Sequence, residues 1–308
     1  MAALARTPAR GDSERTVPGN VLRRIRMVEI KARILADEAL IGTYRSVFRG
    51  SGLEFEEVRE YEPGDDIRSI DWNVTARMGT PFIKKFREDR ELNIYLAVDV
   101  SASSWFGSVE QSKRELATDV ATLLAMTAMN NHDRVGLLRF AEDLQEWLPS
   151  RRGHDHLMRL IRELLYAKPR RVRTELSSAA RFLTNVTKKR SVVFLVSDFL
   201  DVGLTDDPAL RMLGAKHDVI ALVLNDPREI ELPDAGVIAL EDAETGEMAH
   251  IDTSDPGLRE QYASAALRRR VERRRALGRM KIDAVDLFTD RPYVPALMAF
   301  FNARTRRN

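Results

Sequence analysis

The stretch LNIYLAVDVSASS, residues 92–104, decides the fold. Its first eight residues form a nearly continuous apolar run, which predicts a strand buried on both faces inside a parallel sheet. Asp99 ends this run, and Ser101 and Ser103 lie on the turn that follows. In parallel α/β sheets, ligands bind outside the carboxyl ends of the strands. The sequence therefore predicts a functional site at the end of this strand.

Outward from this strand, apolar runs alternate with segments of helical periodicity. The runs predict parallel strands at 92–99, 134–140, 191–197, 218–224 and 282–288, and an antiparallel partner at 143–148. Helical periodicity marks 109–130, 154–166, 175–187, 207–216, 256–277 and 293–304. Because strands alternate with helices, we expect an α/β fold with a mostly parallel sheet and helices on both of its faces.

The N-terminal third follows a different pattern. Apolar positions from Val21 to Ala39 predict a helix. Residues 42–90 are interrupted by Gly and Pro, and we expect strands and turns there, with Pro63-Gly64 at the centre of a type II turn. The predicted divisions are a disordered tail (1–18), a helix with a small β-containing module (19–90) and the α/β domain (91–305) with an inserted hairpin at about 226–251.

Chain direction brings five oxygen-bearing residues to one edge of the sheet, here called the rim, where its parallel strands end. Asp99, Ser101 and Ser103 follow the first strand, Thr174 lies in the loop reached by helix 154–166, and Asp198 follows strand 191–197. Mg²⁺ prefers hard oxygen ligands of this kind. The alternative is helix capping, because Ser, Thr and Asp at a strand-to-helix turn satisfy free backbone N–H groups.

The rim pattern resembles the metal-ion-dependent adhesion site of von Willebrand factor A domains. It has Asp-x-Ser-x-Ser at 99–103, a later Thr174, and Asp198 at the end of the next parallel strand. The resemblance implies Mg²⁺ or Mn²⁺ as the cofactor. Ser101 and Ser103 would be direct ligands, Thr174 direct or switching, and Asp99 and Asp198 direct or water-mediated. One coordination position would be left for a carboxylate of a partner.

A second resemblance covers the chain from about residue 43 to its C-terminus. It rests on RSVFRGSGLEFEEVREYEPGDDIRSIDWNVTAR (45–77), KKFREDRE (84–91), DVSASS (99–104), DRVGLLRF (133–140), VSDF (196–199) and DPRE (226–229). Together these stretches resemble the bacterial domain-of-unknown-function family 58. Many members of that family are thought to work beside MoxR-type AAA+ ATPases in maturing or remodelling other proteins. The resemblance implies such an ATPase as the partner.

Composition excludes several classes of protein. The 308 residues include no cysteine, so disulfides, thiolate metal sites and cysteine nucleophiles are excluded. The chain has no P-loop motif, which argues against nucleotide binding. Its five histidines do not form a catalytic set, since none shares the four-residue spacing of a helical pair. Without a signal-peptide core or a membrane-length apolar run, we expect a soluble cytoplasmic protein.

Two charged segments leave alternatives open. PGDDIRSIDW (63–72) is predicted to be an ion-pair and turn network in which Arg68 or Arg77 pairs with its aspartates. The alternative is a docking surface or a part of the metal rim. RRRVERRR (268–275) lies in a region, 258–308, with 13 Lys/Arg against 5 Asp/Glu. It predicts a solvated helix that buries Leu267, Val271 and Leu277, or a basic patch for nucleic acid or an acidic protein.

The leading functional hypothesis is a non-enzymatic module that binds a partner protein through a metal ion on the rim. The first alternative is a metal-dependent hydrolase that uses metal-bound water, although no histidine base is expected at the rim. The second alternative is nucleic-acid binding through 268–275, although no aromatic side chains are interleaved with these arginines for stacking on bases.

Overall fold

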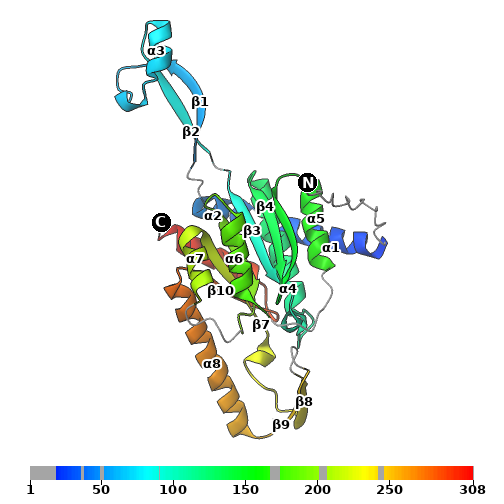
Figure 1. Cartoon of the computed structure of the whole chain (residues 1–308). Helices are drawn as coiled ribbons and strands as arrows, with labels where there is room; N and C mark the ends of the chain where they lie inside the picture. The colour runs from blue at the N-terminus through cyan, green and yellow to red at the C-terminus, as the bar shows by residue number, and fades with distance from the viewer. Residues whose placement is uncertain are drawn as a thin grey trace, which may run out of the picture.

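The computed structural model describes residues 19–35, 38–48, 52–89, 91–166, 174–200, 207–241 and 246–307 (Figure 1). The predicted tail 1–18 lies outside the described residues. A six-stranded sheet with strand order β10-β7-β6-β3-β4-β5 forms the centre. Its strands are β3 (Asn93–Asp99), β4 (Arg134–Phe140), β5 (Leu144–Arg151), β6 (Val192–Ser197), β7 (Asp218–Asn225) and β10 (Asp283–Phe288).

All neighbouring strands in this sheet are parallel except β4 and β5, which are antiparallel. The α/β class and the mostly parallel sheet expected from the sequence are therefore confirmed. The helices that surround the sheet are α4 (Lys113–Asn130), α5 (His154–Leu165), α6 (Leu176–Val186), α7 (Pro208–Lys216), α8 (Pro256–Arg279) and α9 (Val294–Thr305).

Strand β3 shows why both faces of the sheet need cover. Ile94, Leu96 and Val98 belong to a buried cluster with residues of α4, α5 and α9. Tyr95 and Ala97 belong to a second cluster with residues of α6 and α7 and the end of α8. Successive side chains of a strand point to opposite faces, so one apolar run supplies both cores.

Helix α4 begins later than the predicted residue 109, because a capping box fixes its start. The Ser112 side chain accepts from the Glu115 backbone N–H, and the Glu115 carboxylate accepts from the Ser112 backbone N–H. Each satisfies a donor that the first helical turn leaves free. The chain before it forms a short 3-10 helix, η2 (Ala102–Trp105), and a loop.

The N-terminal helix is two helices rather than one, which corrects the sequence prediction. Helix α1 (Gly19–Leu35) packs against α4 and α5, whereas α2 (Glu38–Val47) packs against α9 and α4. Residues 42–47, expected to be strand or turn, are therefore helical. Tyr44 in α2 is buried against Phe48 and Phe301. This aromatic contact joins the N-terminal helices to the core of the sheet domain.

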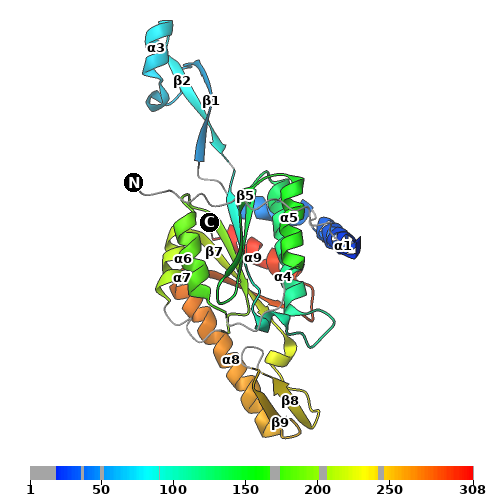
Figure 2. The same ribbon diagram turned by 45° about the vertical axis from the view of Figure 1, so that its right-hand side comes forward.

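A two-stranded antiparallel sheet projects from the body as an arm, defined here as residues 52–89 (Figures 1 and 2). Its elements are β1 (Gly52–Glu60), η1 (Ile67–Ser69), α3 (Trp72–Met78) and β2 (Phe82–Asp89). The turn expected at Pro63-Gly64 is present, since Gly64 has φ 117° and Asp65 N–H donates to the Glu62 carbonyl. Helix α3 was not foreseen.

The arm leaves the sheet at the start of β3, the end opposite to the rim, so its charged segment does not contribute to the rim (Figure 1). Asp65 pairs with Arg59 at 2.8 Å, rather than with the predicted Arg68 or Arg77. Asp66 and Asp71 cap η1 and α3 through backbone N–H groups. The aspartates of this segment therefore hold its turns together.

At the opposite end of the molecule, α8 runs beside a small hairpin of β8 (Val237–Glu241) and β9 (Met248–Asp252) (Figure 2). This is the predicted inserted hairpin; residues 242–245 of its connection lie outside the described residues. Within the described ranges, no helix combines the length and apolarity needed to cross a bilayer.

Candidate functional site

Asp99 stands at the rim with its carboxylate buried and fully engaged. The Ser101 backbone N–H donates to its Oδ1 at 2.9 Å. Its Oδ2 accepts from Thr174 Oγ1 at 3.0 Å and from Ser197 Oγ at 2.7 Å. The side chain is held there because β3 pairs with β4 and β6 on either side and ends at this residue. One carboxylate therefore collects donors from three separate segments.

The three predicted hydroxyl ligands form a chain beside this carboxylate. Thr174 Oγ1 lies 2.9 Å from Ser101 Oγ, and Ser101 Oγ lies 3.1 Å from Ser103 Oγ. The structure thus brings Asp99, Ser101, Ser103 and Thr174 together by direct hydrogen bonds. Ser101 and Thr174 are buried.

The capping alternative fails for two of these hydroxyls. Ser101 holds the N-cap position of η2, but its side chain makes no capping hydrogen bond. Thr174 lies one residue before Glu175, the N-cap of α6, whose side chain makes no capping bond either. Ser101 Oγ and Thr174 Oγ1 instead contact each other, and Thr174 Oγ1 also contacts Asp99. Ser and Thr hydroxyls at a helix start usually bind backbone N–H groups. Here they are directed into the site.

The fifth predicted residue, Asp198, is held by a cation of the protein itself. Lys113 Nζ donates to Asp198 Oδ2 at 2.7 Å and to Glu229 Oε1 at 2.5 Å. The lysine side chain is 0% exposed. Arg273 donates to the Asp198 carbonyl at 2.8 Å and to Asn225 Oδ1 at 3.0 Å. Asp198 therefore joins the rim but faces Lys113.

The charges of the site explain its pKa shifts. Burial and, next, the negative charge of Asp198 raise the pKa of Asp99 to about 6, against the lowering effect of hydrogen bonds from Ser101 and Ser197. Burial lowers the pKa of Lys113, but the charges of Asp198 and Glu229 outweigh it, so the net shift is upward. The negative field at Asp99 thus favours the binding of a positive charge. At Asp198 the ammonium of Lys113 already supplies that charge.

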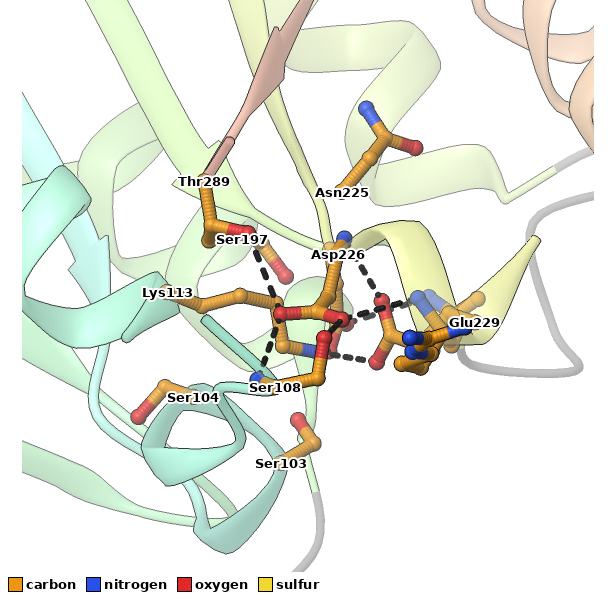
Figure 3. A network of polar contacts seen from close by, with 12 residues as sticks. Ser103, Ser104, Ser108, Lys113, Ser197, Asn225, Asp226, Glu229 and Thr289 are labelled. Carbon is orange, nitrogen blue, oxygen red and sulfur yellow. Dashed lines mark hydrogen bonds and ion pairs between the residues drawn. The ribbon is translucent and has the colours of Figure 1, made fainter. Parts of the chain in front are cut away.

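A second polar network fixes the loops around the site (Figure 3). Asp226 is fully buried and accepts from the Ser108 backbone N–H at 2.9 Å, from Ser108 Oγ and from Thr289 Oγ1 at 3.1 Å. It also caps the 3-10 helix η3 (Pro227–Glu229), in a capping box with Glu229. Loop 106–112, η3 and the end of β10 are therefore tied to one carboxylate, and Glu229 connects them to Lys113.

The oxygen donors at the rim suit a hard divalent cation, although only one of them, the Asp99 carboxylate, carries a formal charge. The donor set offers one carboxylate and three hydroxyls in a buried, net negative place, and Mg²⁺ and Ca²⁺ bind oxygen ligands of these types. Among the residues that the structure describes, no three His, Asp or Glu side chains are spaced to hold a metal ion. A cation at Asp99 would therefore depend on the hydroxyls and on water.

Sequence reasoning missed four residues of the site, which are Lys113, Ser197, Glu229 and Arg273. The Ser112-x-x-Glu115 pattern could have placed the start of α4 and with it Lys113, although not the burial of its side chain. Arg273 belongs to the arginine run that was expected to be solvated. Its side chain is 9% exposed, whereas Leu267 and Val271, expected to be buried, are 61% and 40% exposed. The polar partners of Arg273 turn that face of α8 inward, together with Ala276 and the correctly predicted Leu277.

Exposed apolar side chains surround the rim. Trp105 and Phe106 follow the Asp-x-Ser-x-Ser turn, Val109 lies on the same loop, and Leu200 follows Asp198; their exposed fractions run from 37% to 46%. Arg114 lies over the Trp105 ring at 3.8 Å from its centroid. Exposed apolar side chains that gather in one place are typical of surfaces that bind other proteins.

The parallel sheet with one antiparallel edge strand, and the Asp-x-Ser-x-Ser turn that ends its inner strand β3, define a von Willebrand factor A-like domain. The chain belongs to the family described as "Protein of unknown function DUF58", whose model matches residues 57–272. An uncharacterized protein of Mycobacterium tuberculosis (strain ATCC 25618 / H37Rv), Rv1480, is 34% identical over 92% of this chain and 89% of its own length.

Two solved structures are also similar. An aerotolerance-related membrane protein from Bacteroides fragilis is 15% identical, with a TM-score of 0.44. The conserved hypothetical protein BatB from Bacteroides thetaiotaomicron is 18% identical, with a TM-score of 0.43. Each match covers 70% of this chain and 100% of the other. These are loose likenesses, and the family assignment depends on the sequence matches.

Proposed function

We propose that this chain is a non-enzymatic protein-interaction module that binds a divalent cation, Mg²⁺ or Mn²⁺, at its rim and uses it to hold a carboxylate of a partner protein. Asp99, Ser101, Ser103 and Thr174 supply oxygen ligands to the ion directly or through water. Asp198 adds negative charge beside them. A hard cation completes its coordination with water or an anionic ligand, so a carboxylate from another protein fits the remaining position.

One observation carries this proposal. The hydroxyls of Ser101 and Thr174 turn away from the backbone groups that they would otherwise cap and gather at Asp99. Hydroxyls at a helix start more often accept backbone N–H groups, whereas these two add their oxygen atoms to those of a buried carboxylate, and such a set of oxygens suits a hard cation. The apolar side chains around the rim support a protein as the ligand.

The partner that the family resemblance suggests is a MoxR-type AAA+ ATPase. No nucleotide-binding loop is present in this chain, so the ATPase activity belongs to the partner. In this arrangement the chain acts as an adaptor for protein maturation or complex remodelling.

The test is capture of a purified MoxR-type ATPase by the immobilised full chain, in MgCl₂ and in EDTA. We expect capture in MgCl₂ only, and its loss in the Asp99→Asn variant. Asp66→Asn is the matched control, because Asp66 caps η1 in the arm through the Arg68 backbone N–H, at the end of the sheet opposite to the rim. Equal capture in EDTA, or by folded Asp99→Asn, would reject the metal-bridged interaction.

A further inference from the structure

Lys113 occupies an unfavourable position for a cation. It is the first residue of α4, and the amino end of a helix carries partial positive charge. Its side chain is 0% exposed, and removing an ammonium from water is unfavourable unless anions pair with it. Such a lysine stays charged and buried only where anions fix it. Its two anions are the rim carboxylate of Asp198 and Glu229.

The Asp198 carboxylate would interact with two positive charges, the ammonium of Lys113 and a divalent ion at the rim. Asp198 Oδ2 accepts from Lys113 Nζ at 2.7 Å, and the negative charge of Asp198 also acts on Asp99, whose pKa it raises. A divalent ion beside Asp99 would draw on the charge of Asp198. An ammonium and a divalent ion near one carboxylate repel each other, and at low dielectric this repulsion is larger than in water.

We propose that Lys113 is a tethered counter-cation that competes with the divalent metal for Asp198 and sets how weakly the rim binds it. The inference rests on the proposed metal site and deepens it by naming the residue that limits its affinity. With Lys113 in place, the charges of Asp198 and Glu229 are partly neutralised. The metal ion is then attracted mainly by the Asp99 carboxylate and by neutral hydroxyls. Without Lys113, two further carboxylates face the site with no cation between them.

Glu229 makes this competition a property of the fold. It closes the capping box of η3 with Asp226, and Asp226 is fixed by Ser108 and Thr289. The Glu229 carboxylate is thus held in place to receive Lys113. A metal that displaced Lys113 from Asp198 would leave the ammonium to Glu229 alone, so metal binding at the rim would be transmitted to the start of segment 226–241.

The experiment is isothermal titration of the full chain with MnCl₂ and with MgCl₂. Lys113→Met removes the ammonium, and we expect it to tighten Mn²⁺ and Mg²⁺ binding at least tenfold. Lys113→Arg keeps the charge and should bind metal as weakly as the wild type. Lys31→Met is the matched control. Lys31 of α1 is half exposed and pairs with Asp119 of α4, the helix that carries Lys113. The metal affinity of this variant should not change.

Lys113→Met leaves the buried carboxylate of Asp198 and the partly buried carboxylate of Glu229 without their cation, and we expect it to lower stability. A second variant, Lys113→Met with Glu229→Gln, removes one cation and one anion and keeps the net charge of the site. It should still bind Mn²⁺ more tightly than the wild type, because Asp198 is freed. Its melting temperature should also rise more on addition of MnCl₂, since a ligand that binds only the folded state stabilises it by mass action.

The outcomes separate the two proposals. Tighter binding in both Lys113→Met variants supports the competition. Metal binding by the wild type that these variants do not improve overturns the competition and leaves the metal site standing. Absence of metal binding in the wild type and in every variant rejects both.

Discussion

The Tyr44 hydroxyl donates a 3.0 Å hydrogen bond to Asp133 Oδ2, and this bond fastens helix α2 to the turn that precedes β4. The other oxygen of the same carboxylate accepts from the Leu92 backbone N–H at 2.9 Å. Asp133 therefore joins the N-terminal helices, the start of β3 and the start of β4. Both side chains are buried, so neither can exchange its partner for water.

Tyr44→Phe should lower the free energy of unfolding by about 1–2 kcal/mol, because it leaves a buried carboxylate oxygen without its donor. Urea unfolding followed by circular dichroism measures the change. Tyr166→Phe is the control, since Tyr166 is 40% exposed and its hydroxyl has access to water. Equal stabilities of the two variants would show that the Tyr44 bond does not hold α2.

Asp133 should make stability depend on pH in one direction. Burial raises its pKa to about 6, from an ordinary 3.8. The folded protein therefore holds this proton more tightly than the unfolded chain. The stabilisation is full below about pH 4 and is lost as the pH rises through 6. The stability of wild type relative to Asp133→Asn should fall by about 1–3 kcal/mol from pH 4 to 7. Urea titrations across that range measure it, and a constant difference would contradict the shift.

His217 should act in the opposite direction. Burial, with the charges of Lys216 and Arg190, lowers its pKa to about 4. The ring is held neutral: Nδ1 accepts from the Ser191 backbone N–H at 3.3 Å, and Nε2 lies 2.8 Å from Thr187 Oγ1. Because the unfolded chain takes up the proton first, its stabilisation is present above pH 6.5 and is lost as the pH falls toward 4.

We therefore expect the stability advantage of wild type over His217→Asn to shrink between pH 7 and pH 5. Chemical denaturation at pH 7, 6 and 5 tests this. The exposed His250, changed to Asn, provides the control. A wild-type advantage that stays constant or grows on acidification would show that His217 is charged in the folded protein.

Two glycines in helices should respond to alanine in opposite ways. A Cβ on Gly214 in α7 would meet the Met280 carbonyl oxygen at 2.2 Å, which is backbone and cannot step aside cheaply. Gly214→Ala should therefore lower the unfolding free energy by about 1–3 kcal/mol. A Cβ on Gly278 in α8 meets nothing within 4 Å, and Gly278→Ala should raise it by about 0.5–1 kcal/mol. Thermal unfolding of both variants gives the sign; destabilisation by Gly278→Ala would contradict the helix argument.

The sheet could be predicted well from the sequence because its strands are short, nearly continuous apolar runs, whereas the helices between them show helical periodicity. Strand 134–140 was predicted with the bounds that β4 has in the structure. The convergence of Asp99, Ser101, Ser103 and Thr174 followed from chain direction alone, because parallel strands end at the same edge. Their role as metal ligands stays a prediction.

Lys113 could not be predicted in the same way. Its partners Asp198 and Glu229 lie 85 and 116 residues further along the chain, and a lysine at a helix start has no periodic signature that marks it as buried. The division of the N-terminal helix into α1 and α2 was missed for a related reason. The apolar period from Val21 to Ala39 continues past the end of α1 into the start of α2, but α1 packs on α4 and α5 whereas α2 packs on α9 and α4.

The arm leaves the amino-terminal end of the sheet, and the rim lies at the carboxyl-terminal end (Figure 1). A molecule bound at the rim therefore leaves the tip of the arm unobstructed, with Ile67, Trp72 and Met78 each more than 60% exposed. The six-stranded sheet lies between the rim and the base of the arm (Figure 1). Bodies held at the rim and at the arm would therefore be kept apart by at least the length of its strands.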